Sequence, residues 1–596
     1  MPRSGVLTTM RTWLVAVALG LLAACGGSDG SDGSGGGGST SPPPPPPPAP
    51  AGNVTISGKI TYDFVPAAIS GGLDYGAIEA RPARAISVQF IETSTGATLS
   101  STVTNSAGDY SLSVGPNRTG FVRARARSTQ SGAPGWDFQV VDNTSGNALY
   151  TLDGASLSSG TVDSVRDQHA PAGWTGASYG DPRAAAPFAI LDTIYSAVEY
   201  LLLADGSISF PPLEIHWSPD NVATFGADGE SDPATGEIGT SYYGFSPSQG
   251  LNGIYLLGDE DNDTEEYDPH LILHEFGHYL EYQLGRSDSI GGPHARGDYV
   301  DMRVAFSEGW GSAFAALALG DPMYRDTGGF RQGGAFAFDV EGAGFDFYPP
   351  DGWFAEKSVW ELIYDLSDAA ADGSDSFQYP FADIWSVMTG RIVTTTAVTS
   401  IFPLLNAIKA DHPGDQLLLD QLAADQDIGS VASDFGDNET NNAGSVDVLP
   451  LYTPLIVNNP GPAVNVCSTD EFTSGTTGST NKLSSRRFLR FTPPAAGNVT
   501  ISVTATSIPA NEYSDPDFYV HRQGPIAISD AAPNAACMDI NGVGWNPGNC
   551  AETATVSLAR AEHVLEIYEW TNTNADDDPE YPPIGRTCFD VTVTQP

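Results

Sequence analysis

The stretch from Asp268 to Glu281, DPHLILHEFGHYLE, places three of the chain's nine histidines four residues apart, at 270, 274 and 278. Its Asp-Pro opening is typical of a helix start, where aspartate caps free amides and proline loses no needed donor. On a helix of 3.6 residues per turn, His274 and His278 project from the same face, one turn apart. Two imidazoles so placed can bind one metal ion, and Glu275 beside them can reach a metal-bound water.

The first histidine of the stretch and the mid-helix glycine lead to two further predictions. An ion shared by His274 and His278 would lie about 9 Å along the helix axis from His270, at 1.5 Å per residue. We therefore expect His270 to be a first-turn residue and not a ligand. Gly277 costs about 1 kcal/mol relative to alanine in a helix, which predicts that another backbone approaches it closely.

A catalytic zinc ion commonly has three protein ligands and a water. Glu308 lies thirty residues after His278, inside the apolar, helix-compatible run VDMRVAFSEGWGSAFAALALG. A carboxylate embedded in such a run is costly unless it is ion-paired or bound to a metal. Glu308 is thus the candidate third ligand.

The pattern HEFGH followed by FSEGW resembles the gluzincins, the clan of thermolysin-like and fungalysin-like zinc peptidases, over residues 183–456. The resemblance implies a zinc ion held by His274, His278 and Glu308. Zinc would lower the pKa of its water toward 7 and polarise the scissile carbonyl, and Glu275 would pass the water's proton to the leaving amine. Thermolysin-like enzymes orient the first histidine with an aspartate at the position of Ser312, so we expect orientation from elsewhere, with Asp298 and Asp301 as candidates.

Other residues near the pattern could take part in catalysis or substrate binding. His294 is either an oxyanion stabiliser or, as we favour, an ordinary loop histidine; Arg296 and Arg303 are rival donors, expected to be ion-paired instead. The strand GIYLLG at 253–258 is the expected edge strand for an extended peptide. The aromatic stretch GFDFYPPDGWF at 344–354 either lines substrate subsites or packs as a loop.

An acidic run, GDEDNDTEEYD, precedes the helix and holds Asp259, Asp261 and Asp263 at alternate positions. Such a run can gather a calcium ion, which binds several hard oxygens. It lacks the glycine and final glutamate of an EF-hand, and acids ahead of a helix also favour its dipole. Calcium therefore stands as a second, weaker cofactor prediction.

The start of the chain indicates export. Residues 1–24 carry Arg3, Arg11 and an apolar run too short to span a bilayer, as in a signal peptide. They end in Leu-Ala-Ala-Cys25-Gly, which resembles a bacterial lipobox and implies a lipidated Cys25; the alternative is an ordinary signal peptide with an incidental cysteine. Residues 25–52, rich in glycine and serine and then proline, form a tether. We expect an outer-membrane or cell-surface lipoprotein, anchored in the membrane or released from the cell.

The remainder of the chain predicts a multidomain protein with an α+β catalytic domain between two antiparallel β-sandwiches. The stretch TNSAGDYSLSVGPNRTGFVRARA gives residues 53–130 a resemblance to carboxypeptidase-regulatory-like sandwiches, and residues 131–455 are expected to form the peptidase domain. The stretches FLRFTPPAAGNVTISV and DPDFYVHRQG give residues 456–596 a resemblance to the bacterial pre-peptidase C-terminal domain. In an oxidising compartment the four remaining cysteines predict two disulfides with open connectivity. These are Cys467, Cys537, Cys550 and Cys588.

The net charge of −47, from 73 acids and 26 bases, argues against nucleic acid as a partner. The predicted function is zinc-dependent hydrolysis of peptide bonds in proteins or peptides at the cell surface. Two alternatives stay open: an inactive surface-binding protein, and a zinc hydrolase of a non-protein amide.

Overall fold

The computed structural model describes residues 52–68, 71–226, 231–246, 251–342, 351–368, 378–509, 514–521, 525–526, 551–574 and 582–596. The expected signal peptide, the expected lipidation residue Cys25 and the tether up to residue 51 lie outside these ranges. Cys537, Cys550 and most of the aromatic stretch at 344–354 lie outside them as well.

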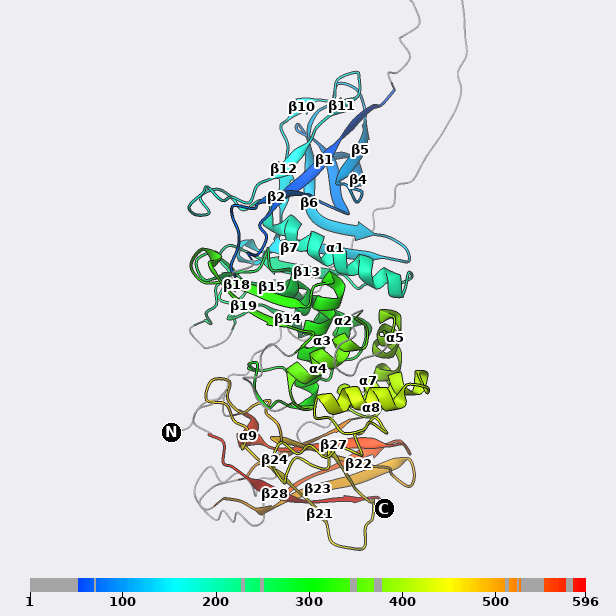
Figure 1. Ribbon diagram of the computed structural model, residues 1–596. Coiled ribbons are helices and arrows are strands. Elements are labelled where there is room, and N and C mark those ends of the chain that lie inside the picture. Colours follow the sequence, from blue (N-terminus) through cyan, green and yellow to red (C-terminus); the bar gives the residue numbers. More distant parts are fainter. Residues whose placement is uncertain are drawn as a thin grey trace, which may run out of the picture. The chain divides into compact units, whose positions relative to one another are not determined.

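Two sheets form the first part of the described chain (Figure 1). The smaller is built around β1, whose inward residues alternate along the strand. The larger has ten strands in the order β14-β15-β13-β7-β6-β3-β4, with three short strands beside β6 and β7. The strands of the smaller sheet are β1 (Val54–Phe64), β2 (Glu79–Pro82), β5 (Asp109–Val114), β11 (Ser164–Val165) and β12 (Gln168–Ala170). Those of the larger are β3 (Ile86–Glu92), β4 (Thr98–Val103), β6 (Thr119–Gln130), β7 (Trp136–Asp142), β8 (Ala148–Leu149), β9 (Thr151–Asp153), β10 (Leu157–Ser158), β13 (Leu213–Trp217), β14 (Tyr242–Ser246) and β15 (Leu251–Leu256).

The larger sheet crosses the expected domain boundary at residue 130. Strand β6 ends at Gln130 and pairs antiparallel with β7, which pairs in parallel with β13. The sheet is mixed: its parallel pairs lie among strands after residue 130, whereas β3, β4 and β6 pair antiparallel with one another, as expected of the first sandwich. The buried residues of β1, β3 and β6 also belong to the same hydrophobic core as the helices that follow. The accessory β-region and the helical region are therefore built on one shared sheet.

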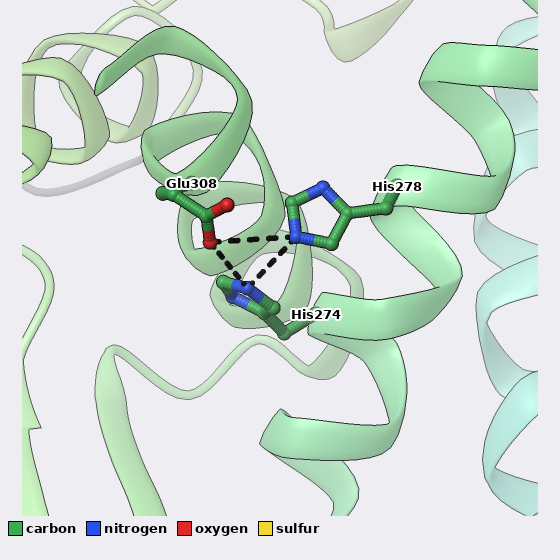
Figure 2. A group of neighbouring side chains, drawn as sticks. All are labelled: His274, His278 and Glu308. Atoms are coloured by element: carbon green, nitrogen blue, oxygen red, sulfur yellow. Dashed lines mark hydrogen bonds and ion pairs between the residues drawn. The ribbon is translucent and has the colours of Figure 1, made fainter. Parts of the chain in front are cut away.

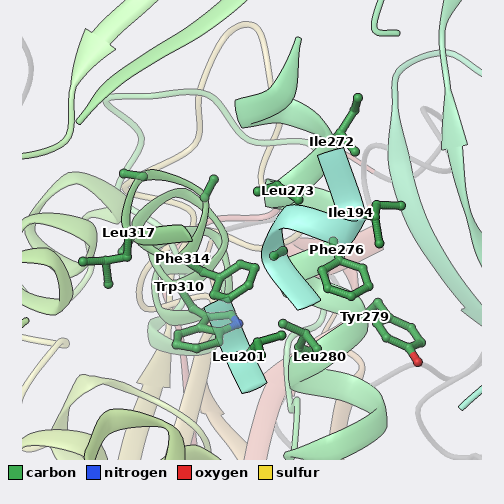
Figure 3. Close-up of a cluster of buried hydrophobic side chains, with 14 of the residues drawn as sticks. Ile194, Leu201, Ile272, Leu273, Phe276, Tyr279, Leu280, Trp310, Phe314 and Leu317 are labelled. Carbon is green, nitrogen blue, oxygen red and sulfur yellow. The ribbon is translucent and has the colours of Figure 1, made fainter. Parts of the chain in front are cut away.

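The helices follow, and α1 and α2 contact strands of this sheet, while α3 packs on α1, α2 and α4. The helices are α1 (Ala186–Ala204), α2 (Pro269–Leu284), α3 (Met302–Leu319), α4 (Glu356–Asp365), α5 (Phe381–Ser386), α6 (Ile392–Thr394), α7 (Ile401–Asp411) and α8 (Gln416–Asp425). Figure 3 shows the apolar side chains where α1, α2 and α3 meet, among them Leu201, Phe276 and Phe314. Within the described part of the chain α1 is long and apolar enough to cross a membrane, but 67% of its most apolar window is buried, as expected of a core helix.

Helix α2 begins at Pro269, as the Asp-Pro signal predicts. The prediction that the Asp268 side chain caps it is wrong. Its carboxylate accepts hydrogen bonds from the backbone amide and the hydroxyl of Thr327 instead, at 3.1 and 2.7 Å. Thr327 belongs to a four-stranded sheet of β16 (Gly258–Asp259), β17 (Asp263–Thr264), β18 (Met323–Gly328) and β19 (Gly334–Asp339). Asp268 thereby ties the start of α2 to β18.

The last part of the chain is β-rich, with two sheets packed around a separate apolar core. The 11-residue strand β23 shows how the sequence forms this core: its buried apolar residues alternate with threonines and serines that point away from it. Cys467 and Cys588 face each other on β21 and β28 and form a disulfide, one of the two predicted. The strands are β20 (Tyr452–Pro454), β21 (Val464–Ser468), β22 (Arg486–Phe491), β23 (Gly497–Ser507), β24 (Pro516–His521), β25 (Pro525–Ile526), β26 (Ala551–Leu558), β27 (His563–Glu569) and β28 (Thr587–Thr594), with a short helix α9 (Trp570–Asn574).

Candidate metal centre

Helices α2 and α3 approach each other through a pair of glycines. A Cβ atom on Gly277 would lie 3.0 Å from the Cα atom of Gly311, which confirms the predicted close approach of a second backbone. The indole of Trp310 donates to the carbonyl of Gly277 at 2.9 Å and fixes the two helices against each other. A Cβ atom on Gly311 would lie 2.9 Å from Nδ1 of His274. Gly311 is therefore the residue that leaves room for the His274 ring.

The close contact of the two helices brings His274, His278 and Glu308 together, with their polar atoms pointing toward one point (Figure 2). The two Nε2 atoms are 3.1 Å apart, and Glu308 Oε2 lies 3.2 Å from that of His274 and 3.4 Å from that of His278. The three side chains are 12–16% exposed. The trio is thus partly open to solvent while its carboxylate sits inside an apolar helix.

The triangle has the dimensions that a tetrahedral zinc ion requires. Ligand atoms 2.0–2.1 Å from a tetrahedral centre lie about 3.3 Å from one another. Two imidazole nitrogens and a carboxylate oxygen are also a donor set that zinc accepts. The residues present therefore fit the ion that the sequence pattern predicts.

Two serines of α3 orient the two rings. The Ser312 hydroxyl lies 3.2 Å from Nδ1 of His274, and that of Ser307 lies 3.1 Å from Nδ1 of His278. Ser307 also donates to Glu281 at 2.7 Å. Its oxygen can then accept a hydrogen bond from Nδ1–H of His278, which directs Nε2 of this ring toward the trio.

The expectation that Asp298 or Asp301 orients His274 is wrong. Asp298 accepts from the backbone of Ala295 and lies 3.4 Å from Lys482. Asp301 caps the first turn of α3 and pairs with Arg303. Ser312, which stands where thermolysin-like enzymes have aspartate, contacts the ring itself.

The charges of the trio act strongly on one another. Burial lowers the pKa of His278, but the Glu308 carboxylate outweighs burial and raises it to about 9. Burial raises the pKa of Glu308, but His294 and His278 outweigh it and hold it well below the usual range. Glu308 is therefore a carboxylate, the form that binds a metal.

His294 lies on a loop, as favoured from the sequence, but its ring reaches the trio. Its Nε2 atom is 3.3 Å from Glu308 Oε2 and 3.9 Å from Glu356 Oε1 at the start of α4. Its Nδ1 atom lies 3.0 Å from the Gly292 carbonyl, to which it donates. With 29% of its side chain exposed, His294 is more open to solvent than any of the three trio side chains. Of the two rival donors, Arg296 stacks on Phe336, and Arg303 pairs with Asp301 and Glu566.

Two further residues of α2 lie where the helical spacing predicts: Glu275 lies near the trio, and His270 lies away from it. Glu275 is 7% exposed, and its charge acts on His278 and on Tyr324. His270 is buried away from the trio, with Nε2 2.9 Å from the carbonyl of Asp321. The Tyr324 ring on β18 packs against His270 and His274, with centroids 5.3 and 6.2 Å apart.

The expectation that GIYLLG is an edge strand is wrong. Strand β15, which holds most of it, pairs with β13 on one side and antiparallel with β14 on the other. The strand at this end of the sheet is β14. The described end of the aromatic stretch is packed in the core, where Trp353 is 3% and Phe354 0% exposed.

Among the described residues, Asp259, Asp261 and Asp263 do not form the joint calcium site that the acidic run predicted. Asp259 accepts a hydrogen bond from the amide of Asp261 at 3.1 Å in a surface turn. Asp263 instead lies close to Glu265 and to Asp326 on β18. Burial, and then the charge of Asp326, raises the pKa of Asp263 to about 7.

Comparison with known proteins adds little to this description. No protein-family model matches the chain, and no curated protein matches it. Three similar solved structures are the pre-peptidase C-terminal domain of a collagenase from Bacillus anthracis, a periplasmic inhibitor of g-type lysozyme from Aeromonas hydrophila and a 9R-lipoxygenase from Cyanothece. Their identities are 12%, 12% and 9%, each with a TM-score of 0.13. The first two matches cover 24% of this chain and 95% and 96% of the others, and the third covers 28% and 26%. At these TM-scores the likenesses carry no inference about fold or function.

Proposed function

We propose that the protein is a zinc-dependent peptidase that hydrolyses peptide bonds of proteins or peptides at the cell surface. The observation that carries the proposal is the triangle of His274, His278 and Glu308, with ligand atoms 3.1–3.4 Å apart and Glu275 beside it on α2. The gluzincin resemblance of the sequence supports the same assignment.

The chemistry divides between the ion and the side chains. Zinc, when bound by the trio, supplies a Lewis acid that activates water and polarises a carbonyl. Glu275 accepts the proton of the attacking water and transfers it to the leaving amine. His294, held by its hydrogen bond to Gly292, donates from Nε2 to the oxygen of the substrate carbonyl as negative charge develops there.

An extended substrate needs a strand edge to pair with. Strand β14 lies at the end of the sheet next to α2, and its Tyr243 accepts a hydrogen bond from Gln283 of that helix. We assign the substrate strand to β14 in place of β15, because the backbone of β15 is already paired on both sides.

The proposed location rests on the first 25 residues. The signal peptide and the lipobox-like Cys25 support export and membrane anchoring. A Cys25→Ser protein should lose membrane retention in cell fractionation, and retention equal to wild type would refute the lipid anchor.

The test of the activity is hydrolysis of casein and of a peptide library, with zinc content measured on the same preparation. We expect about one zinc per chain, cleavage abolished by a zinc chelator, and a loss of about 100-fold or more in Glu275→Gln without loss of zinc. Glu199→Gln, an exposed change on α1, is the matched control and should cleave as wild type does.

Each contrary outcome would favour a different function or mechanism for this protein. Zinc binding without cleavage of any peptide, but with hydrolysis of another amide, would favour a non-protein substrate. Absence of zinc and of hydrolysis would favour a surface-binding protein. A Glu275→Gln protein as fast as wild type would refute the mechanism.

A further inference from the structure

A group of three carboxylates lies outside the trio, where β17 and β18 pair. Asp263 is on β17, Glu265 directly follows that strand, and Asp326 is on β18. One oxygen of each lies within 4.8 Å of one oxygen of both others. Residues 263 and 326 are 63 positions apart in the sequence, so the group is made by the fold and not by a local acidic run.

The group contains buried oxygens without hydrogen-bond donors. Glu265 is 1% exposed; its Oε1 accepts from Ser241 at 3.0 Å, while its Oε2 is fully buried and has no hydrogen-bond partner among the described residues. Within the same part of the chain, the Oδ1 atom of Asp263 is also fully buried without a partner. An unsatisfied buried carboxylate oxygen is costly, and it is the observation that calls for a ligand.

The neighbouring basic side chains are committed elsewhere in the described part of the chain. Arg325, next to Asp326, pairs with Asp321 at 2.9 Å, and Arg183 pairs with Glu266. A fourth carboxylate, that of Asp268, lies near and is 1% exposed. Among the described residues, these carboxylates therefore gather negative charge inside the protein without a salt bridge to a lysine or arginine.

We propose that Asp263, Glu265 and Asp326 bind a second metal ion, best matched by Ca²⁺, at the junction of β17, β18 and the start of α2. The site is separate from the zinc trio and does not depend on the proposed peptidase activity. A divalent cation would offset two of the three negative charges and give the two unpartnered oxygens a partner.

The donor set favours calcium over other ions. All three side chains offer hard oxygen atoms, and none of them is a histidine or cysteine, which would favour zinc or copper. Two oxygens bound to one Ca²⁺ at 2.3–2.6 Å can be up to about 5 Å apart, whereas Mg²⁺ at 2.0–2.1 Å requires a tighter set. The three oxygens, all within 4.8 Å of one another, fall within the span that Ca²⁺ can bridge.

The position of the site gives the cation a structural role. Asp326 lies two residues after Tyr324, whose ring packs on His270 and His274. Asp268, at the first turn of α2, is bonded to Thr327 of the same strand. A cation that holds β17 to β18 would thus stabilise the strand against which the α2 histidines pack.

The experiment uses the full-length protein with its zinc in place. Calcium binding is followed by isothermal titration, and the thermal unfolding midpoint is measured with Ca²⁺, with Mg²⁺ and with neither. Glu265→Gln and Asp326→Asn test the site. Asp259→Asn and Asp261→Asn, which remove the same charge from the neighbouring surface turn, are the matched controls.

We expect about one Ca²⁺ per chain, a higher unfolding midpoint with Ca²⁺, and a smaller effect of Mg²⁺. Both site variants should weaken binding by about tenfold or more, while the controls keep it. Without calcium the site variants should unfold at or above the wild-type midpoint, because one of the mutually repelling charges is gone.

The proposal is overturned if wild-type protein shows neither titration heat nor a midpoint shift with millimolar Ca²⁺, a result that needs no variant to fold. It is also overturned if the controls lose binding as strongly as the site variants. Zinc content and casein cleavage are measured on the same samples, so that a failure of the peptidase proposal is seen separately.

Discussion

The Arg303 guanidinium and the Glu566 carboxylate form an ion pair in which both side chains are 2% exposed. Two hydrogen bonds of 2.9 and 3.1 Å join the first turn of α3 to strand β27, across 263 positions of sequence. Glu566 also accepts from His521 and Arg486. The helix that carries Glu308 is therefore anchored to the C-terminal β-region by a buried charged network.

Replacing Glu566 with glutamine should strongly destabilise the protein. The change leaves the cations of Arg303 and Arg486 with one carboxylate, that of Asp301, and such a loss inside a protein costs about 3–5 kcal/mol. The control is Asp437→Asn, which breaks the exposed pair with Arg490 on β22 and should cost less than about 1 kcal/mol. Thermal or urea unfolding measures both changes, and equal losses in the two variants would show that burial of the Arg303 pair contributes little.

Lys482→Met should lower the turnover of the proposed peptidase while zinc stays bound. Lys482 is 1% exposed and donates to the carbonyl of Pro293 at 2.9 Å, so it holds the loop that carries His294. We expect kcat to fall about tenfold and KM to change little, because the loop would be misplaced and not lost. Steady-state kinetics with zinc content checks this.

The matched control is Lys409→Met, a half-buried lysine whose side chain is 11% exposed and pairs with Asp420. It should cost stability but leave the activity per folded molecule as in wild type. A similar fall of kcat in both variants would mean that general loosening, and not the His294 loop, explains the effect.

Gly311→Ala should weaken zinc binding by displacing the His274 ring, which lies 2.9 Å from the position of the added Cβ atom. Displacing one ligand should reduce affinity about 10- to 100-fold. Competition with a chromogenic chelator measures the change. Gly390→Ala is the control, because among the described residues no atom outside its own stretch of backbone lies within 4 Å of its Cβ position. Unaltered zinc affinity in Gly311→Ala would contradict the ligand role of His274.

Replacing Glu569 with glutamine should make the stability of the protein against unfolding depend less on pH. Burial raises the pKa of Glu569 to about 7, although Ser514 and the Asp515 amide act against it. The folded state then binds the proton more tightly than the unfolded state, so stability is highest below the unfolded pKa of about 4.5 and falls as pH rises to about 7. The loss should be on the order of 3 kcal/mol.

Unfolding midpoints of wild type and Glu569→Gln between about pH 5 and about pH 8 check this sign. The variant should lose less stability than wild type over that range. Glu471→Gln, an exposed change in the same region, should follow the wild-type curve. Parallel curves for Glu569→Gln and wild type would contradict the pKa assignment.

The trio could be predicted from sequence because each of its parts is local. The spacing of His274 and His278 sets their common helix face, and an apolar run makes the carboxylate of Glu308 conspicuous. The contacts of Ser307, Ser312 and Glu281 were missed, because a hydroxyl's partner depends on how α2 and α3 are rotated against each other. Glu356 was missed for the same reason, since nothing in its own helix points to His294.

The errors concern relationships between distant segments. The sequence of β15 shows an apolar strand but not that β14 pairs with its outer side. The acidic run before α2 suggested Asp259 and Asp261, whereas the partner of Asp263 lies on β18, after the second site helix. The boundary at residue 130 coincides with a turn between strands, and a turn looks the same within a domain as between two.

The pairing of β6 with β7 has a practical consequence for dissecting the protein. A shortened chain starting after Gln130 would leave β7 without the neighbour whose hydrogen bonds span Arg127–Gln130 and Trp136–Gln139. That newly exposed backbone would offer a template for strand addition by other molecules, so such a fragment should associate or precipitate on expression. Fragments meant to isolate the metal centre should therefore begin at the first strand, near Val54.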